Sequence, residues 1–193
     1  MRVLVVHAHP VAESFNGALH RLIVEKLAGA GHDVDDCDLY AEDFEPRLTR
    51  SERLDYHDPS RNTLPVAGHV ERLRRAEGLV LSHPVWNFGY PAIMKGWFDR
   101  VFLPGVSFDI IDGVVRPKLR HIRKVAAATT YGGTRLRAFL AGDPPRKMVM
   151  RVLRVQVALD ARFRYLAHYD MNRSTPATRE AFLKRVGSEM ERF

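Results

Sequence analysis

Five strand-like runs alternate with helical patterns along the chain, and this alternation restricts the fold more than any other feature. The runs are 2–6, 33–39, 78–82, 124–129 and 163–168. Within the first, Val3–Val6 is continuously apolar, as expected for a parallel strand that is covered on both faces. Strands joined by helical crossovers predict an α/β fold, a doubly wound five-stranded parallel sheet with helices on both faces.

The intervening segments predict helices with apolar residues at helical spacing. We expect them at 16–30, 66–76, 91–101 and 147–159, with a last helix that begins at Thr175-Pro176. Pro91 suits a first helical turn, because no N–H group is required there. The polar stretch 40–65 is interpreted as a surface excursion or a partner contact rather than a linker. With 193 residues and no internal repeat, we expect a single domain, 1–193.

The chain contains no signal for export or for a membrane. No apolar run reaches the roughly 18 residues of a membrane-spanning helix, and the N-terminus lacks a secretory pattern. The single cysteine, Cys37, excludes an intrachain disulfide and is expected to be a buried thiol. We therefore expect a cytoplasmic protein without a membrane span.

The positive charge lies in the second half of the chain. Residues 1–100 hold 12 basic and 15 acidic side chains, and residues 101–193 hold 18 basic and 8 acidic ones, for a net charge of +7. This excess is typical either of a nucleic-acid surface or of a solvated basic face that attracts phosphorylated ligands. No nucleic-acid motif accompanies the charge, so we favour the second interpretation and expect no nucleic-acid partner.

The loop 9–16 connects the first strand to the first helix. An anionic group, usually a phosphate, binds at such a helix start. The loop lacks the glycines of a dinucleotide-binding turn and of a P-loop, but it offers Ser14 and Asn16 as neutral polar groups, with Phe15 between them. The alternative is that Ser14 or Asn16 only caps the helix.

Two further loops hold unusual residues. The segment 84–90 is rich in aromatic residues and proline, and the segment 129–133 contains Thr130, Gly132 and Gly133. The aromatic side chains are suited to wall a flat ligand, although each taken singly is more often a core residue. Because the three loops follow the first, third and fourth strands, we expect them to meet in one crevice at the carboxyl ends of the strands.

Neither a hydrolytic motif nor a metal motif accompanies these loops. His7 and His9 share a strand face, but no carboxylate or cysteine lies near them in the sequence, so we expect no metal site. The crevice instead suits a planar cofactor with a phosphate, which would supply the chemistry. Catalytic side chains are not assigned.

Four motifs identify a family resemblance. They are H-x-x-x-x-S-F-N at 9–16, D-L-Y-A-x-x-F-x-P at 38–46, P-A-I-x-K-G-W-F-D-R-V-F at 91–102 and T-T-x-G-G at 129–133. Over nearly its whole length the chain resembles the flavodoxin-like NAD(P)H:quinone oxidoreductases, NAD(P)H dehydrogenases (quinone). This group includes animal quinone reductase and bacterial potassium-efflux ancillary oxidoreductases. The resemblance implies a flavodoxin-like fold.

The resemblance also implies a non-covalent flavin, FAD or alternatively FMN. FAD is favoured because the loop 9–16 keeps the spacing of FAD-binding members. By the family pattern, one loop contacts the phosphate and ribityl part, one lines the isoalloxazine and one approaches the pyrimidine edge. The residues of the phosphate and ribityl part are His9, Ser14, Phe15 and Asn16. Those of the isoalloxazine are Pro84, Val85, Trp86, Asn87 and Phe88. Those of the pyrimidine edge are Thr130, Gly132 and Gly133.

The reaction implied by the resemblance is ping-pong. NAD(P)H delivers a hydride to flavin N5, and a quinone or similar acceptor then takes two electrons. The family also implies a homodimer. An alternative function is a flavin-binding regulatory subunit of an ion-efflux or other partner, suggested by the stretch 40–65 and the basic second half.

The chain departs from the family after the fourth strand. Family members often have a tyrosine and a histidine after T-T-G-G, whereas here Tyr131 lies within the motif and 134–147 contains neither residue. We therefore do not transfer that pair. Arg135 and Arg137 are candidates to bind the phosphate of NADPH or an acidic acceptor, with solvated surface as the alternative. The order Trp86-Asn87 also differs from the animal enzymes.

Overall fold

The computed structural model describes all residues 1–193 and contains a five-stranded parallel sheet. The strand order is β2-β1-β3-β6-β7, the order of flavodoxin-like doubly wound sheets. The strands are β1 (Arg2–His7), β2 (Asp33–Asp38), β3 (Gly78–Val85), β6 (Lys124–Tyr131) and β7 (Arg162–His168). The predicted fold and all five predicted strands are therefore confirmed.

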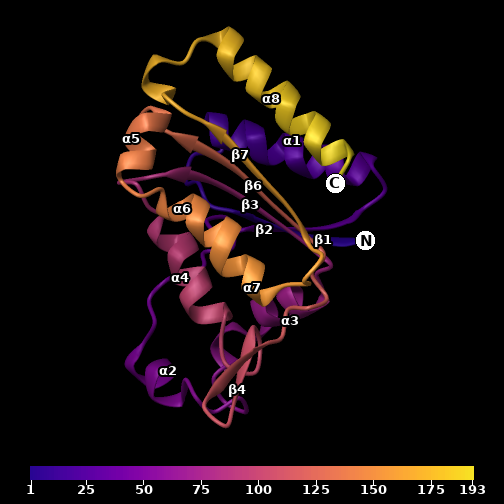
Figure 1. The fold of residues 1–193 in the computed structure, drawn as a ribbon, viewed down its shortest axis with the longest axis vertical. Helices are drawn as coiled ribbons and strands as arrows, with labels where there is room; N and C mark the ends of the chain where they lie inside the picture. Colours follow the sequence, from indigo (N-terminus) through magenta and orange to yellow (C-terminus); the bar gives the residue numbers. More distant parts are fainter.

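Helices cover both faces of this sheet (Figure 1). Alternate side chains of each strand point to opposite faces, and β1 illustrates the result. Val3 and Val5 join the core under α1 and α8, whereas Leu4 and Val6 join the larger core on the other face. On the first face lie α1 (Phe15–Gly29) and α8 (Pro176–Glu191); on the second lie α3 (Ala67–Arg75), α4 (Ala92–Val101), α6 (Pro144–Lys147), η2 (Met148–Leu153) and α7 (Arg154–Gln156).

The helix predicted at 147–159 differs from the structure. Helical backbone begins at Pro144, passes through the π-helical segment η2 and ends at Gln156, where Val157 pairs with Leu119. The helix α5 (Arg135–Leu140) and the short helices η1 (Leu64–Val66) and η3 (Met171–Arg173) were not predicted. Each of these spans only one or two turns, too short for a periodic pattern to be recognised.

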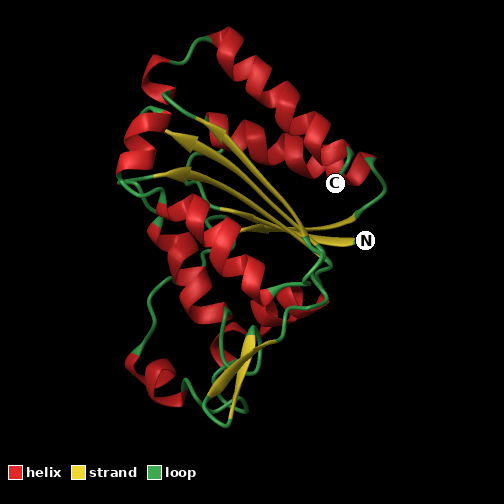
Figure 2. Cartoon of the chain, in the orientation of Figure 1, coloured by secondary structure: helices red, strands yellow, loops and turns green.

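A hairpin was also not predicted, although its sequence contains a turn signal. The strands β4 (Phe108–Ile111) and β5 (Val114–Pro117) pair antiparallel at the end of the molecule remote from the parallel sheet (Figure 2). Asp112 and Gly113 connect them, both with positive φ angles of 52° and 74°. An Asp-Gly pair is a preferred two-residue hairpin turn. Most side chains of these two strands are exposed, so the strands lack the alternation of apolar and polar residues that predicts a half-buried strand.

The stretch 40–65 is held against α4 by contacts between two of the family motifs, 38–46 and 91–102. A Cβ atom on Gly96 would lie 2.3 Å from the carbonyl oxygen of Pro46, so only glycine permits this approach. The Arg100 guanidinium donates to the carbonyl oxygen of Glu45 and pairs with Glu52, in a pair whose side chains are each 8% exposed. Glu52 belongs to the short helix α2 (Arg50–Asp55), which Thr49 caps. The predicted surface excursion is thus anchored at its middle.

No helix combines the length and the apolar composition that a bilayer crossing requires.

Candidate functional site

The three predicted loops meet at the carboxyl ends of the adjacent strands β1, β3 and β6. Asn16 Nδ2, at the start of α1, donates to Thr130 Oγ1 at 2.7 Å and so joins the first loop to the third. The ring of His9 lies 5.9 Å from that of Trp86 and joins the first loop to the second. The three loops therefore meet at one place, where the sequence predicts a crevice, and we call this place the loop crevice.

The first loop folds back onto the start of α1. Ser14 Oγ accepts a hydrogen bond from the Gly17 N–H at 3.1 Å and lies 3.0 Å from Nδ1 of His9. A Cβ atom on Gly17 would lie 2.1 Å from the carbonyl oxygen of Ala12, so glycine is required. Of the two candidate caps, Ser14 caps the helix and Asn16 does not.

Unpaired groups remain at this helix start. The backbone N–H groups of Phe15 and Asn16 make no hydrogen bond within the chain, and they lie where the helix dipole favours an anion. The Asn16 side chain is buried, yet its Oδ1 has no partner. A buried acceptor without a partner is costly, and a hydroxyl group of a bound molecule would satisfy it. These groups fit a phosphate that is attached to a polyol chain.

The second loop contains a tight turn in a strained conformation. Trp86 and Gly89 exchange backbone hydrogen bonds of 3.2 and 2.9 Å. Between them, Asn87 and Phe88 have φ angles of 47° and 59°, which a bulky residue such as phenylalanine seldom adopts. Such strain is retained most often at functional sites. The turn leaves the N–H groups of Asn87 and Phe88 unpaired.

The structure separates core residues of this loop from wall residues. Trp86 and Phe88 are 42% and 41% exposed, so their rings are available to a ligand. Pro84 is buried and Val85 is half-buried at the end of β3. Tyr90 packs edge-on against Phe98, and its hydroxyl donates to the Pro145 carbonyl oxygen. The aromatic wall is therefore made by Trp86 and Phe88.

The third loop adds two more backbone donors. The N–H groups of Gly132 and Gly133 have no partner within the chain. The carbonyl oxygen of Gly133 accepts the N–H group of Asp170 at 2.8 Å, which fixes the loop to the segment after β7. The loop crevice is thus bordered by backbone donors from all three loops.

A tyrosine cluster behind the third loop was not predicted. Tyr131 donates to Asp143 Oδ1 at 2.6 Å, shares a short hydrogen bond with the Tyr165 hydroxyl and packs 4.6 Å from the Tyr169 ring. Burial raises the pKa of Tyr131 and of Tyr165, so both phenols stay protonated at neutral pH. The parallel pairing of β6 with β7 brings Tyr131 near Tyr165 and Tyr169.

Phe15 lies apart from the other predicted site residues. Its ring meets His168 edge-on at 5.9 Å and lies 6.4 Å from Phe182 of α8. Phe15 therefore offers its backbone N–H to the loop crevice, while its side chain belongs to the core between α1 and α8.

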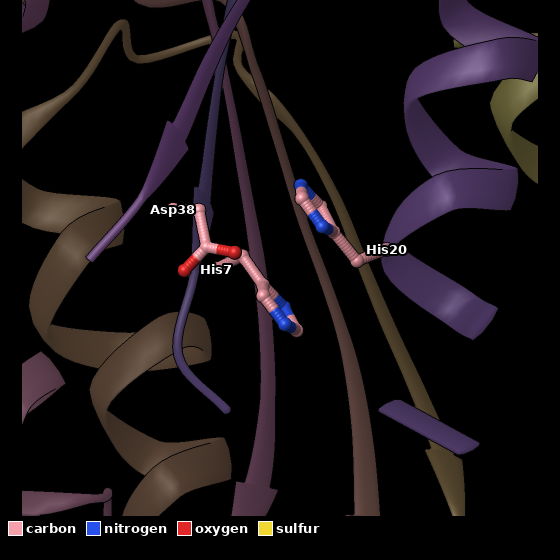
Figure 3. A group of neighbouring side chains, drawn as sticks. All are labelled: His7, His20 and Asp38. Atoms are coloured by element: carbon pink, nitrogen blue, oxygen red, sulfur yellow. The ribbon is translucent and has the colours of Figure 1, made fainter. Parts of the chain in front are cut away.

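His7 and His9, considered as a metal pair, do not face each other. The His7 ring instead stacks on His20 with centroids 4.1 Å apart and planes within 2° (Figure 3). Nitrogen atoms of these rings and a carboxylate oxygen of Asp38 lie within 4.8 Å of one another. A nitrogen lone pair lies in its ring plane, so two parallel stacked rings cannot both point at one ion. Burial and the neighbouring His20 lower the pKa of His7 to about 4.

Comparisons with known proteins identify the family and the fold of the chain. The sequence profile of a family described by its flavodoxin-like fold matches residues 1–185. A ribosyldihydronicotinamide dehydrogenase (quinone) of Mus musculus is 34% identical over 153 residues, which cover 69% of this chain and 64% of the mouse protein. A ribosyldihydronicotinamide dehydrogenase-like protein of Penicillium crustosum is 40% identical over 121 residues, which cover 54% of this chain and 45% of the fungal protein.

Among solved structures, the NAD(P)H:quinone oxidoreductase from Methanothermobacter marburgensis superimposes with a TM-score of 0.82 and 25% identity. The superposition covers 99% of this chain and 98% of that one. The matched part spans less than two thirds of the mouse and fungal relatives.

Proposed function

The chain belongs to a protein family of flavodoxin-like fold, and from this premise we propose that it is a flavin-dependent NAD(P)H dehydrogenase (quinone). It would transfer two electrons from NAD(P)H through bound flavin to a quinone or a similar acceptor in ping-pong fashion. One observation carries the proposal: backbone donors from three loops, with the partnerless Asn16 Oδ1, border one crevice beside exposed aromatic rings. The names of the mouse, fungal and archaeal relatives support it.

Each loop has a distinct part in holding the cofactor. The N–H groups of Phe15 and Asn16 would bind the phosphate, and Asn16 Oδ1 would accept a hydrogen bond from the ribityl chain. His9 and Ser14 hold the first loop in shape through their mutual contact. Trp86 would contact the tricyclic ring, since burial of flat apolar area favours such a contact.

When bound, the flavin supplies the redox chemistry, accepting a hydride and passing two electrons onward. The chain contributes preorganised donors. The N–H groups of Asn87, Phe88, Gly132 and Gly133 are unpaired, and donors held in place stabilise negative charge as it develops. Thr130 keeps the third loop in register with α1 through Asn16.

We further propose FAD as the cofactor, with FMN as the alternative, and a homodimer as the assembly. The hairpin carries four apolar side chains that are half exposed, which a second copy would cover: Ile110, Ile111, Val114 and Val115. The free, buried thiol of Cys37 is compatible with the proposed cytoplasmic location.

Anaerobic stopped-flow spectroscopy tests the function. The purified protein should be yellow, and NADH or NADPH should bleach the flavin absorbance, which a quinone then restores. Mass spectrometry of the small molecule released by heat distinguishes FAD from FMN, and sedimentation velocity measures the assembly. Protein that takes up neither flavin would refute the proposal. Bound flavin that no reduced nicotinamide bleaches would favour the regulatory alternative.

A further inference from the structure

A basic cavity lies beside the loop crevice and is not used by the function proposed above. It encloses about 270 Å³ between α5, the segment α6–η2 and the end of β7. Its walls carry four cationic side chains and two aromatic ones: Arg135, Arg146, Lys147, Arg151, Phe139 and Tyr169. Pockets for whole small-molecule ligands hold about 300–1,000 Å³, so this cavity suits the charged portion of a larger ligand.

The four cations are not neutralised by the protein. None of them takes part in any ion pair of the chain. The walls hold one carboxylate, Asp143, which also accepts the Tyr131 hydroxyl at 2.6 Å, so positive charge remains in excess on the walls. Like charges that outnumber their counterions repel, and an anionic ligand relieves that repulsion. Guanidinium groups bind phosphate especially well, because their donors match its oxygens.

The position of the cavity connects it to the loop crevice. Tyr131 lies between Thr130 and Gly132 of the third loop, and it contacts the cavity residues Asp143 and Tyr169. Arg135, on the cavity wall, also lies only two positions after Gly133, so the cavity adjoins the loop crevice. Phe139, 73% exposed, provides an aromatic face at the cavity wall, suited to a purine base.

We propose that this cavity binds the phosphate groups of a reduced dinucleotide, so that the protein selects a phosphorylated hydride donor. This inference rests on the proposed function and names its donor class. Ribosyldihydronicotinamide, the donor in the names of two relatives, carries no phosphate and would gain nothing from the four cations. Arg135 is one of the two arginines expected to bind phosphate; Arg137 does not line the cavity.

Substitution of single cations tests the proposal. The variants are Arg146→Gln and Arg151→Gln. The control is Arg162→Gln, which removes the same charge from an exposed position at the opposite, amino end of the sheet. Steady-state KM is measured for NADPH, NADH and ribosyldihydronicotinamide. Losing one charge-assisted contact to phosphate should raise KM about tenfold for a phosphorylated donor, with no change for ribosyldihydronicotinamide and no effect of Arg162→Gln.

A binding measurement keeps the test independent of the flavin. Calorimetric titration with adenosine 2′,5′-bisphosphate should give binding that weakens about tenfold in Arg146→Gln and Arg151→Gln but not in Arg162→Gln. Protein that binds this nucleotide but takes up no flavin would refute the proposed function and would still support the proposal that the cavity binds phosphate groups. An equal KM change for all three donors, or equal weakening in the Arg162 control, would overturn the cavity proposal. A larger effect for NADPH than for NADH would assign the cavity to the 2′-phosphate.

Discussion

Asn16 and Thr130 are 114 residues apart in the sequence and are joined by a buried side-chain hydrogen bond of 2.7 Å. The bond links the start of α1 to the end of β6, and it leaves Asn16 Oδ1 buried without a partner. Because Ser14 is the helix cap, the role of Asn16 can be separated from capping.

Asn16→Ala should therefore weaken flavin binding as well as the fold. We expect flavin Kd to rise at least about tenfold, since a bound hydroxyl loses its acceptor, and stability to fall by about 1–3 kcal/mol, since Thr130 loses its partner. Ser14→Ala is the matched control and should cost about 1 kcal/mol through the lost cap. Fluorescence titration of flavin and urea unfolding measure the two quantities. Unchanged flavin affinity in Asn16→Ala would limit Asn16 to a structural role.

Phe88→Gly should stabilise the fold while weakening the redox site. Glycine adopts the φ angle of 59° without strain, and relief of such strain is worth about 1–3 kcal/mol. The exposed ring is lost at the same time, which should slow flavin reduction or quinone turnover. Thermal unfolding and turnover are compared with those of Asn87→Gly, which relieves strain without removing a ring. If Phe88→Gly is instead destabilised, the Phe88 ring stabilises the fold by packing against the protein and is not free to contact a ligand.

Gly96→Ala should be strongly destabilising, because the new Cβ would lie 2.3 Å from the Pro46 carbonyl oxygen. Overpacking of this kind costs about 1–3 kcal/mol. Gly29→Ala is the control, since it lies in α1 with open space around it, and should leave stability equal or raise it by up to about 1 kcal/mol. Chemical denaturation measures the free energy of unfolding of both variants. Equal values would contradict the close approach of Gly96 to the Pro46 carbonyl oxygen.

Arg100→Ala should detach the stretch 40–65 from α4. The variant removes the ionic partner of Glu52, which then keeps only its hydrogen bonds from Thr49, and it leaves the Glu45 carbonyl oxygen without its Arg100 donor. Breaking one side of a buried pair costs about 3–5 kcal/mol. Limited proteolysis should then cut within 40–65 before the rest of the chain unfolds. Cleavage at the wild-type rate would contradict this anchoring role.

Stability should fall as pH is lowered from about 6.5 to about 4. Burial lowers the pKa of His83 to about 4, and burial with the adjacent His20 does the same for His7, whereas unfolded histidine titrates near 6.5. In this window the unfolded state binds more protons than the native state, so protonation favours unfolding. Each group adds at most about 1.4 kcal/mol per pH unit.

Urea unfolding at pH 7.5, 5.5 and 4.5 measures this dependence. His83→Gln should reduce the slope of stability against pH. The comparison uses slopes, because His83→Gln also changes a buried hydrogen bond to the Pro84 carbonyl oxygen. Identical slopes in wild type and His83→Gln would show that His83 titrates normally.

Local pattern alone predicted much of this fold. Apolar runs of four to eight residues and helical spacing are properties of neighbouring residues, so the five strands and the longer helices could be read from the chain. The rule that ligands bind beyond the carboxyl ends of parallel strands then placed the loops 9–16, 84–90 and 129–133 in one crevice. Short or exposed elements such as α2 and α5 carry too few buried positions to leave a pattern.

The sequence by itself therefore determined which strands form, which loops meet and which residues stand near the crevice. Only the tertiary structure decided what each side chain does there. In the structure, the Phe15 side chain packs in the core, whereas Trp86 is exposed. Asn16 is hydrogen-bonded to Thr130, and the four cationic side chains of the basic cavity lie near Tyr131. These outcomes depend on register and on packing between distant segments, and periodicity within one segment contains no information about either.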